Sequence, residues 1–240
     1  MSVQQMRNES LNNASEITGN VENAEPTLEK IGLIGDVHGE DKRLERALKC
    51  LAEQDVDDIL CTGDIVDGTG SVDRCFELLE QYQVYTVRGN HDRWYLENRM
   101  RDLPNATLGL QPHSKQYLDE MKPTLTFDTQ RGSLLLCHGI GENDMALLKP
   151  DDIGYALNSN IDLEQLLASR KYGLIVGGHT HLPMVRNFGV TLFINPGCLC
   201  STKSSAFSVL DLTNNSITNF SFEGEDTLTS FTRDLDLSLI

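Results

Sequence analysis

Short runs of apolar and β-branched residues alternate with stretches whose apolar residues recur at helical spacing. Residues 31–35 form the first apolar run, and the following pattern predicts an amphipathic helix over 41–53. A strand at 59–62, a helix with one apolar face over 72–79 and a strand at 83–87 come next. This strand–helix–strand–helix–strand order predicts three parallel strands joined by right-handed crossovers.

Beyond residue 92 the pattern changes. A helical or irregular stretch covers 92–122, and buried strands are predicted at 134–137 and 174–176. Shorter strands separated by turn residues follow at 184–187, 191–194, 206–210 and 216–222. Their spacing suggests hairpins, and therefore a second, more antiparallel sheet.

The two ends of the chain differ from the middle. The pattern predicts a flexible tail over 1–28, a folded domain over 29–222 and an acidic C-terminal tail over 223–240. The first residues lack the basic start and apolar stretch of a signal peptide, which predicts the cytoplasm as the compartment. Six cysteines without a secretion signal are expected to be reduced thiols, mostly buried.

Composition narrows the class of protein. The chain has 240 residues, of which 39% are hydrophobic and 23% charged, as in globular proteins. No apolar run reaches the roughly 18 residues of a membrane-spanning helix. The formal charge of −16 disfavours binding to nucleic-acid polymers and leaves small phosphorylated substrates open.

Candidate chemistry lies at the strand ends. Histidines follow predicted strands at five positions, beside or near glycine: His38, His91, His138, His179 and His181. Asp36, Asp64 and Asn90 occupy similar positions. Each such residue alone is usually a turn or a satisfied core residue, but their joint occurrence favours convergence on one crevice at the carboxyl ends of the strands. A cluster of imidazoles and carboxylates is costly to bury without a neutralising metal ion.

These blocks occur in a recognisable order: Asp36-x-His38, Gly63-Asp64-x-x-Asp67, Gly89-Asn90-His91-Asp92, His138-Gly139 and Gly178-His179-x-His181. Together they resemble the calcineurin-like metallophosphoesterase superfamily, and most closely its small bacterial phosphodiesterase branch. The resemblance covers residues 31–200. It implies an α/β fold, a four-layer sandwich of two mixed β-sheets flanked by helices.

The resemblance also implies a centre of two divalent transition-metal ions, Mn, Fe or Zn. One ion would be held by Asp36, His38 and His181, the other by Asn90, His138 and His179, with Asp64 bridging them. His91 would contact the phosphate and help to protonate the leaving oxygen.

Residues next to these blocks are expected to support the site or the core. Asp67 is expected to orient a ligand rather than bind metal, and Asp92 to act as a partner of an imidazole. Arg93 could clamp a substrate phosphate or lie solvated at a helix start. Trp94 could stack on a base or cover the core, and the core is favoured. Cys198, in a loop that resembles Asn-Pro-Gly-Ser, forms with Cys200 a pair too small to complete a tetrahedral metal site.

Three functions follow from this pattern. The first is hydrolysis of small phosphodiesters by a metal-activated hydroxide, which the ending Gly178-His179-Thr180-His181 favours. The alternative is a phosphomonoesterase of the protein phosphatase or diadenosine tetraphosphatase type, but those enzymes usually carry arginine where this chain has Gly68. The third, a scaffold without turnover, is disfavoured because all seven implied ligands and His91 are present.

Overall fold

The computed structural model describes residues 27–200, 205–224 and 227–240. The predicted N-terminal tail lies outside the described residues except for its last two positions. Within the described ranges, no helix is both long enough and apolar enough to cross a membrane. All six cysteines are free, and four of them are buried, as predicted.

The first sheet has six strands in the order β11-β10-β9-β1-β2-β3. In chain order these are β1 (Lys30–Ile34), β2 (Asp58–Cys61), β3 (Tyr85–Thr86), β9 (Ala206–Asp211), β10 (Ser216–Glu223) and β11 (Thr227–Asp234). The pairs β1–β2 and β2–β3 are parallel, which confirms the crossover topology predicted from the first ninety residues. The other three strands are antiparallel to their neighbours.

The second sheet has five strands in the order β4-β5-β6-β8-β7. They are β4 (Thr124–Thr129), β5 (Gly132–Cys137), β6 (Leu174–Val176), β7 (Met184–Asn187) and β8 (Leu192–Asn195). The two outer pairs are antiparallel, and β5, β6 and β8 run parallel. Both sheets are therefore mixed.

One prediction about the sheets is wrong. The strands expected at 206–210 and 216–222 do not join the second sheet but extend the first, because β9 pairs with every residue of β1. Hairpin spacing specifies the local β9–β10 pair and carries no information on that distant partner. Residues 227–234, predicted as part of an acidic tail, form β11 on the outer side of β10.

The core lies in three layers that follow the alternation of side chains along the strands. In β5, Leu134 and Leu136 face the other sheet, whereas Leu135 and Cys137 face the opposite side. In β1, Leu33 likewise faces the second sheet. Because the central strands β2, β5, β6 and β8 are covered on both faces, they are buried over most of their length, as the apolar runs in the sequence indicated.

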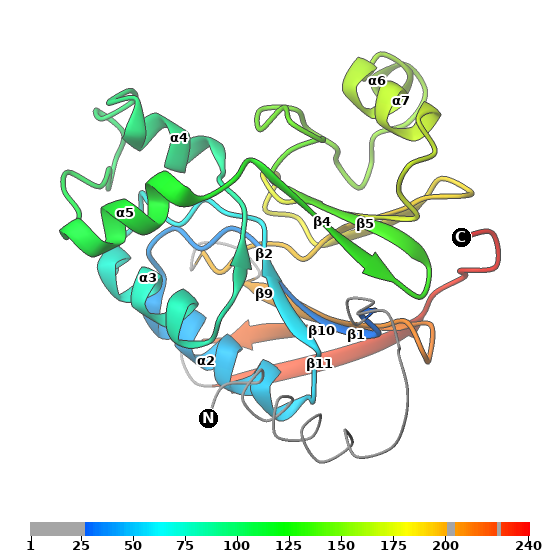
Figure 1. Ribbon diagram of the computed structural model, residues 1–240, viewed down its shortest axis with the longest axis horizontal. Helices are drawn as coiled ribbons and strands as arrows, with labels where there is room; N and C mark the ends of the chain where they lie inside the picture. Colours follow the sequence, from blue (N-terminus) through cyan, green and yellow to red (C-terminus); the bar gives the residue numbers. More distant parts are fainter. Residues whose placement is uncertain (1–26, 201–204, 225–226) are drawn as a thin grey trace, which may run out of the picture.

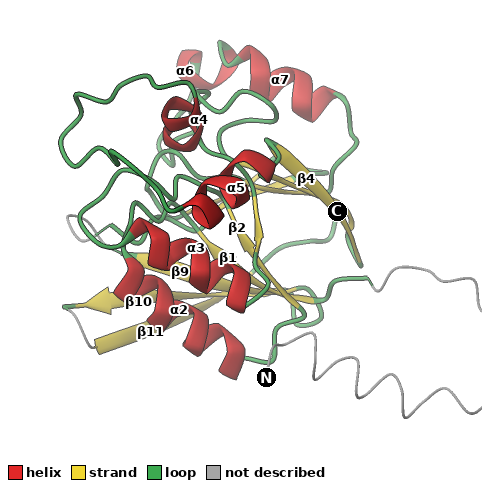
Figure 2. Ribbon diagram, turned by 60° about the vertical axis from the view of Figure 1, so that its left-hand side comes forward, coloured by secondary structure: helices red, strands yellow, loops and turns green. Residues whose placement is uncertain are grey.

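Helices cover the outer faces of the two sheets. They are α2 (Asp41–Glu53), α3 (Val72–Gln81), α4 (Asn90–Leu96), α5 (Pro112–Glu120), α6 (Tyr155–Asn158) and α7 (Ile161–Ala168). Figures 1 and 2 show α2 and α3 against the six-stranded sheet and α7 beyond the other. The layers confirm the predicted four-layer sandwich.

Candidate metal centre

The loops after β1, β2, β3, β5 and β6 meet at one edge of the sandwich. The ring centroid of His38 lies 4.9 Å from that of His91 and 5.0 Å from that of His181. The rings of His138 and His179 are 5.1 Å apart. Histidines separated by up to 143 positions in sequence are thus brought together, as the strand-end pattern predicted.

Asp36, His38, Asp64 and His181 form the first half-site, in which one ligand atom of each residue lies within 4.8 Å of the others. His38 Nδ1 donates to the backbone oxygens of Val66 (3.2 Å) and Asp67 (3.0 Å). In the neutral imidazole Nε2 therefore carries the lone pair, and it faces Nε2 of His181 at 3.2 Å.

Asp36 gives this half-site an unpaired carboxylate oxygen. Its Oδ1 accepts hydrogen bonds from Thr62 Oγ1 (3.1 Å) and from the His179 backbone (3.2 Å). Its Oδ2 is buried without a hydrogen-bond partner, although it lies 3.0 Å from Nε2 of His181. A proton on His181 Nε2 can serve either this oxygen or Nε2 of His38, whereas a cation serves all three atoms.

The second half-site is centred on Nε2 of the buried His138. Nδ1 of His138 donates to the Thr62 backbone oxygen at 2.8 Å, so Nε2 carries the lone pair of the neutral ring. This atom lies 2.9 Å from Asn90 Oδ1 and 3.2 Å from His179 Nδ1. Acceptor atoms that face each other at this distance are a ligand set for a cation.

Asp64 lies between the two half-sites. Its Oδ1 accepts a hydrogen bond from the His91 backbone at 2.8 Å. Its Oδ2 lies 3.3 Å from His138 Nε2 and 3.8 Å from His38 Nε2. The same oxygen is therefore within reach of both groups of ligands.

The charges of the cluster favour ionised carboxylates. Burial opposes ionisation, but the charge and hydrogen bond of His138 hold the pKa of Asp64 well below its usual range. Burial also opposes ionisation of Asp36, but the close approach of His181 and the charge of His138 lower its pKa. Burial alone would lower the pKa of His138, yet Asp64 raises it to about 10. Burial and the charge of His138 lower the pKa of His179.

The backbone of these loops is strained at the ligands themselves. Left-handed φ angles occur at His38 (47°), Asp64 (50°), His179 (67°) and His181 (60°), a region that residues with a side chain rarely adopt. Such strain persists where surrounding contacts determine the conformation, and it is common at functional sites. At Gly178 an added Cβ would collide with Asp36 and Thr62, so glycine is required for this close approach.

His91 is held by a network that the sequence only partly suggested. Its Nδ1 lies 2.8 Å from Oδ2 of Asp67, and Arg101 donates to both oxygens of Asp67 at 2.9 Å. Burial opposes ionisation, but hydrogen bonds from His91 and Arg101 lower the pKa of Asp67 to about 2. Burial disfavours the charged imidazole, yet the hydrogen bond to Asp67 raises the pKa of His91.

The other residues singled out beside the motifs have mixed positions. Arg93 makes a bidentate ion pair with Asp144, through Nε at 2.6 Å and Nη2 at 2.9 Å. Trp94 is half-buried, with its ring 4.8 Å from that of His91. Asp92 does not orient an imidazole: its carboxylate accepts hydrogen bonds from the backbones of residues 65, 66 and 89, and burial raises its pKa to about 7.

Several supporting residues were not anticipated. Asn195 Nδ2 donates to the Gly178 backbone oxygen (2.7 Å) and to Thr180 Oγ1 (3.0 Å), and thereby holds the turn between His179 and His181. Thr62 holds Asp36 through its side chain and His138 through its backbone oxygen. Asn195 begins the loop that resembles Asn-Pro-Gly-Ser, but the sequence assigns no role to it. The sequence signal for Thr62 is only its proximity to a motif, which does not distinguish it from other loop residues.

Comparisons with known proteins agree with this geometry. A model of the calcineurin-like phosphoesterase superfamily domain matches residues 30–215. An uncharacterized protein of Methanocaldococcus jannaschii is 24% identical over 179 residues, covering 70% of this chain and 68% of that protein. A metallophosphoesterase from Sphaerobacter thermophilus has a similar structure, with a TM-score of 0.63 and 23% identity over 82% of this chain and 89% of the other. An archaeal phosphodiesterase aligns with a TM-score of 0.52 and 16% identity, over 80% of this chain and 99% of that chain.

The family model spans most of the chain and includes every loop that contributes to the candidate centre. The order of the motifs, the four-layer sandwich and the convergent ligand atoms lead to the same assignment. The chain therefore belongs to the calcineurin-like phosphoesterase superfamily and is a metal-dependent phosphoesterase.

Proposed function

We propose that the chain hydrolyses small phosphodiesters at a centre of two divalent ions. The observation that carries the proposal is the position of Asp64 Oδ2, 3.3 Å from His138 Nε2 and 3.8 Å from His38 Nε2. A carboxylate oxygen placed between two sets of lone pairs suits two cations that share one ligand. Asp36, His38 and His181 would hold one ion, and Asn90, His138 and His179 the other.

Two bound ions would supply a hydroxide nucleophile at neutral pH and neutralise charge on the phosphoryl oxygens. The residues of this chain hold that arrangement in place. Backbone acceptors orient His38 and His138 so that their Nε2 atoms face inward. Neighbouring imidazoles lower the pKa of Asp36 and Asp64, and bound cations would favour the ionised carboxylates in the same way.

His91 is the proposed acid for the departing oxygen. Its Nδ1 is engaged by Asp67 at 2.8 Å, which leaves Nε2 to donate a proton. The side chain is 23% exposed, so it is accessible to a bound phosphoester. The hydrogen bond to Asp67 raises the pKa of His91, and a raised pKa favours the protonated form that a general acid needs.

The phosphodiester class rests on the loops around the centre. The turn Gly178-His179-Thr180-His181 is held by Asn195. At Gly68, where protein phosphatases usually carry arginine, an added Cβ would collide with the His38 backbone oxygen. No phosphate-gripping side chain fits at that position without a backbone shift. A monoester dianion depends more on such cations than a diester monoanion does.

The donor set and the net charge indicate which metals and which substrates suit this centre. Manganese, iron or zinc suit a mixed set of imidazole, carboxylate and amide ligands. The net charge of −16 favours a short or cyclic diester over a nucleic-acid polymer. We keep the cytoplasm as the predicted compartment.

The test compares bis(p-nitrophenyl) phosphate with p-nitrophenyl phosphate, using metal-stripped protein to which Mn²⁺, Fe²⁺ or Zn²⁺ is added back. We expect a higher kcat/KM for the diester and no turnover without metal. A clear preference for the monoester would assign the chain to the phosphomonoesterase alternative. Full metal loading with no hydrolysis of either substrate would favour the scaffold.

A further inference from the structure

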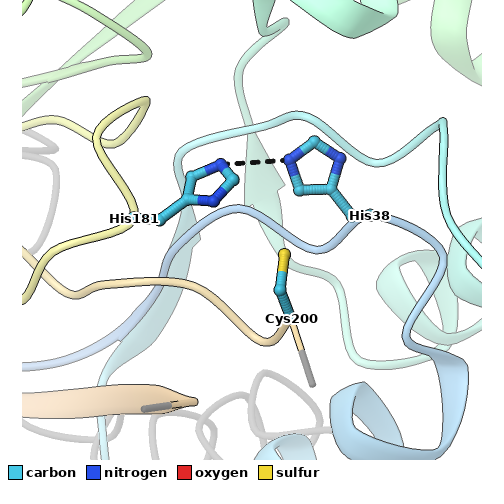
Figure 3. Close-up of side chains that lie close together, drawn as sticks. All are labelled: His38, His181 and Cys200. Atoms are coloured by element: carbon cyan, nitrogen blue, oxygen red, sulfur yellow. Dashed lines mark hydrogen bonds between the residues drawn. The ribbon is translucent and has the colours of Figure 1, made fainter. Parts of the chain in front are cut away.

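A cysteine outside the implied ligand set lies against the first half-site. Sγ of Cys200 and one nitrogen each of His38 and His181 lie within 4.8 Å of one another. Figure 3 shows the sulfur pointing toward the gap between the two rings, whose Nε2 atoms face each other at 3.2 Å. The sequence alone gave no reason to expect this, because Cys198-x-Cys200 has no second cysteine pair.

The segment before Cys200 is fixed to the loop after β1 that carries Asp36. The backbone N–H of Leu199 donates to the Asp36 backbone oxygen at 2.8 Å, and Arg43 donates to the Leu199 oxygen at 3.2 Å. The Leu199 side chain is fully buried. The neighbour of Cys200 is therefore anchored on both its polar groups and its side chain, which limits how far the thiol can move from the histidines.

A second observation points to a ligand at the same place. Asp36 is fully buried, and its Oδ2 has no hydrogen-bond partner. That oxygen lies 3.0 Å from Nε2 of His181, on the histidine pair that Cys200 approaches. Two groups of potential ligands therefore share His38 and His181, one with the Asp36 carboxylate and the other with the Cys200 thiol. Oxygen, nitrogen and sulfur donors of this kind suit a soft or borderline divalent ion.

We propose that Cys200 is an additional protein ligand of the ion held by Asp36, His38 and His181. The inference rests on the proposed binuclear centre. On binding, the thiol releases its proton to solvent and the sulfur coordinates as thiolate. In a tetrahedral zinc site sulfur and nitrogen ligands are separated by ~3.5 Å, given bonds of about 2.3 Å and 2.0 Å. The sulfur and the two histidine nitrogens lie within 4.8 Å of one another, which is close to that separation.

The consequence is a difference between the two half-sites. With Cys200 the first offers sulfur, nitrogen and oxygen, whereas the second offers only nitrogen and oxygen from Asn90, His138, His179 and Asp64. Thiolate favours zinc and other softer ions over manganese. The inference therefore predicts that zinc, cobalt or ferrous iron occupies the first half-site and that manganese competes effectively only for the second.

Cys198 has a different position from Cys200. It is fully buried and forms an isolated bridge with Asp36, and it is not part of the group that Cys200 makes with the two histidines. Its thiol nevertheless makes hydrogen bonds with His181 and Cys200, so Cys198→Ser tests the alternative sulfur. Cys50 on α2, half-buried, provides a distant control.

The experiment loads metal-stripped full-length protein with Co²⁺ under a thiol-free reductant and records the near-ultraviolet sulfur-to-cobalt charge-transfer band. We expect the band in the wild type, in Cys50→Ser and in Cys198→Ser, and its loss in Cys200→Ser. Zinc X-ray absorption should show one sulfur neighbour at about 2.3 Å that disappears in Cys200→Ser. Zinc affinity at that half-site should fall at least tenfold, since loss of a mere outer partner costs about 10–100-fold.

Other results would overturn the inference. A band that survives in Cys200→Ser, or one that is lost only in Cys198→Ser, would assign the sulfur elsewhere. A wild-type protein that binds cobalt and hydrolyses the diester without a band would refute the cysteine ligand and leave the proposed function standing. A band without diester hydrolysis would retain the ligand and refute the function. A wild type that binds no cobalt would refute both.

Discussion

The carboxylate of Asp67 holds the imidazole of His91, with Oδ2 2.8 Å from Nδ1. The same carboxylate accepts hydrogen bonds from both Nη atoms of Arg101, each at 2.9 Å. The side chain of Asp67 is 3% exposed and that of His91 is 23% exposed, so the pair places its buried end toward Arg101 and its accessible end toward solvent. This arrangement orients His91 and favours its protonated form.

Asp67→Asn is expected to shift the pH profile of diester hydrolysis. The amide preserves the shape but removes the charge, and the hydrogen bond to Asp67 is the largest influence that raises the pKa of His91. A raised pKa keeps His91 protonated to higher pH, so loss of the Asp67 charge should lower the pKa of His91 and move the alkaline limb of kcat/KM to lower pH. Asp73→Asn, a change at a half-buried carboxylate that accepts a hydrogen bond from the Gln111 backbone N–H, serves as the control. An unchanged alkaline limb in Asp67→Asn would separate Asp67 from catalysis.

His91→Ala is expected to lower turnover without loss of metal. His91 contributes no ligand atom to the metal-capable groups, so metal content and Tm should stay close to wild type. Turnover should fall by roughly 10²–10⁴-fold on a diester with an alkoxide leaving group, the usual effect of losing a positioned acid. The loss should be smaller for p-nitrophenolate, which departs without protonation.

The comparison for His91→Ala is His113→Ala, which removes an exposed histidine paired with Glu80 and should leave activity unchanged. If His91→Ala loses metal, His91 is a ligand and the assignment of its role is wrong. An equal loss on good and poor leaving groups would indicate a phosphate contact rather than an acid.

Strand-end residues show how far sequence can predict this site. His38, His138 and His179 follow apolar runs, and parallel strands bring their carboxyl ends to one edge, so their convergence could be predicted. The network around Asp67 could not be, because Arg101 lies in an irregular stretch and reaches the carboxylate across 34 positions. Long-range contacts of side chains have no periodic signal in sequence.

The fold divides in the same way. The parallel order of β1, β2 and β3 follows from short crossovers and was predicted. The addition of β9 to β1 depends on which strand of the first sheet has a free edge, and hairpin spacing carries no information on that. Cys200 is a similar case: it becomes a candidate ligand only because the Leu199 backbone bonds to Asp36.

Asp64→Asn tests the bridge between the half-sites. The oxygen that faces both His38 and His138 would lose its charge, so the affinities for both ions should fall together. Asn90→Ala removes a group that contacts only the second half-site and should weaken one ion. Elemental analysis of dialysed protein measures both. Full occupancy of one site in Asp64→Asn would contradict a bridging role.

The guanidinium of Arg93, which could clamp a substrate phosphate, makes an ion pair with Asp144. A double-mutant cycle measures how much this ion pair contributes to stability. The two side chains are 27% and 18% exposed, so we expect a coupling energy of about 1 kcal/mol in urea unfolding of Arg93→Ala, Asp144→Ala and the double variant. If Arg93 also contacts substrate, Arg93→Ala will raise KM for the diester more than Asp144→Ala does. Equal KM values for Arg93→Ala and Asp144→Ala would show that Arg93 only holds the loop that carries Asp144.

Gly68→Ala tests whether the loop at this position has room for a side chain, such as the arginine of protein phosphatases. The added methyl group would collide with the backbone oxygen of His38, and overpacking of this kind costs about 1–3 kcal/mol, or a Tm drop of about 3–10 °C. Because the displaced backbone carries a ligand of the first half-site, the affinity for that ion should fall as well, measured by competition with a chromophoric chelator. The matched control is Gly109→Ala, where no atom lies within 4 Å of the added carbon. If Gly68→Ala binds both ions as the wild type does and keeps its Tm, the loop has room for a side chain, and the exclusion of an arginine no longer supports the phosphodiester preference.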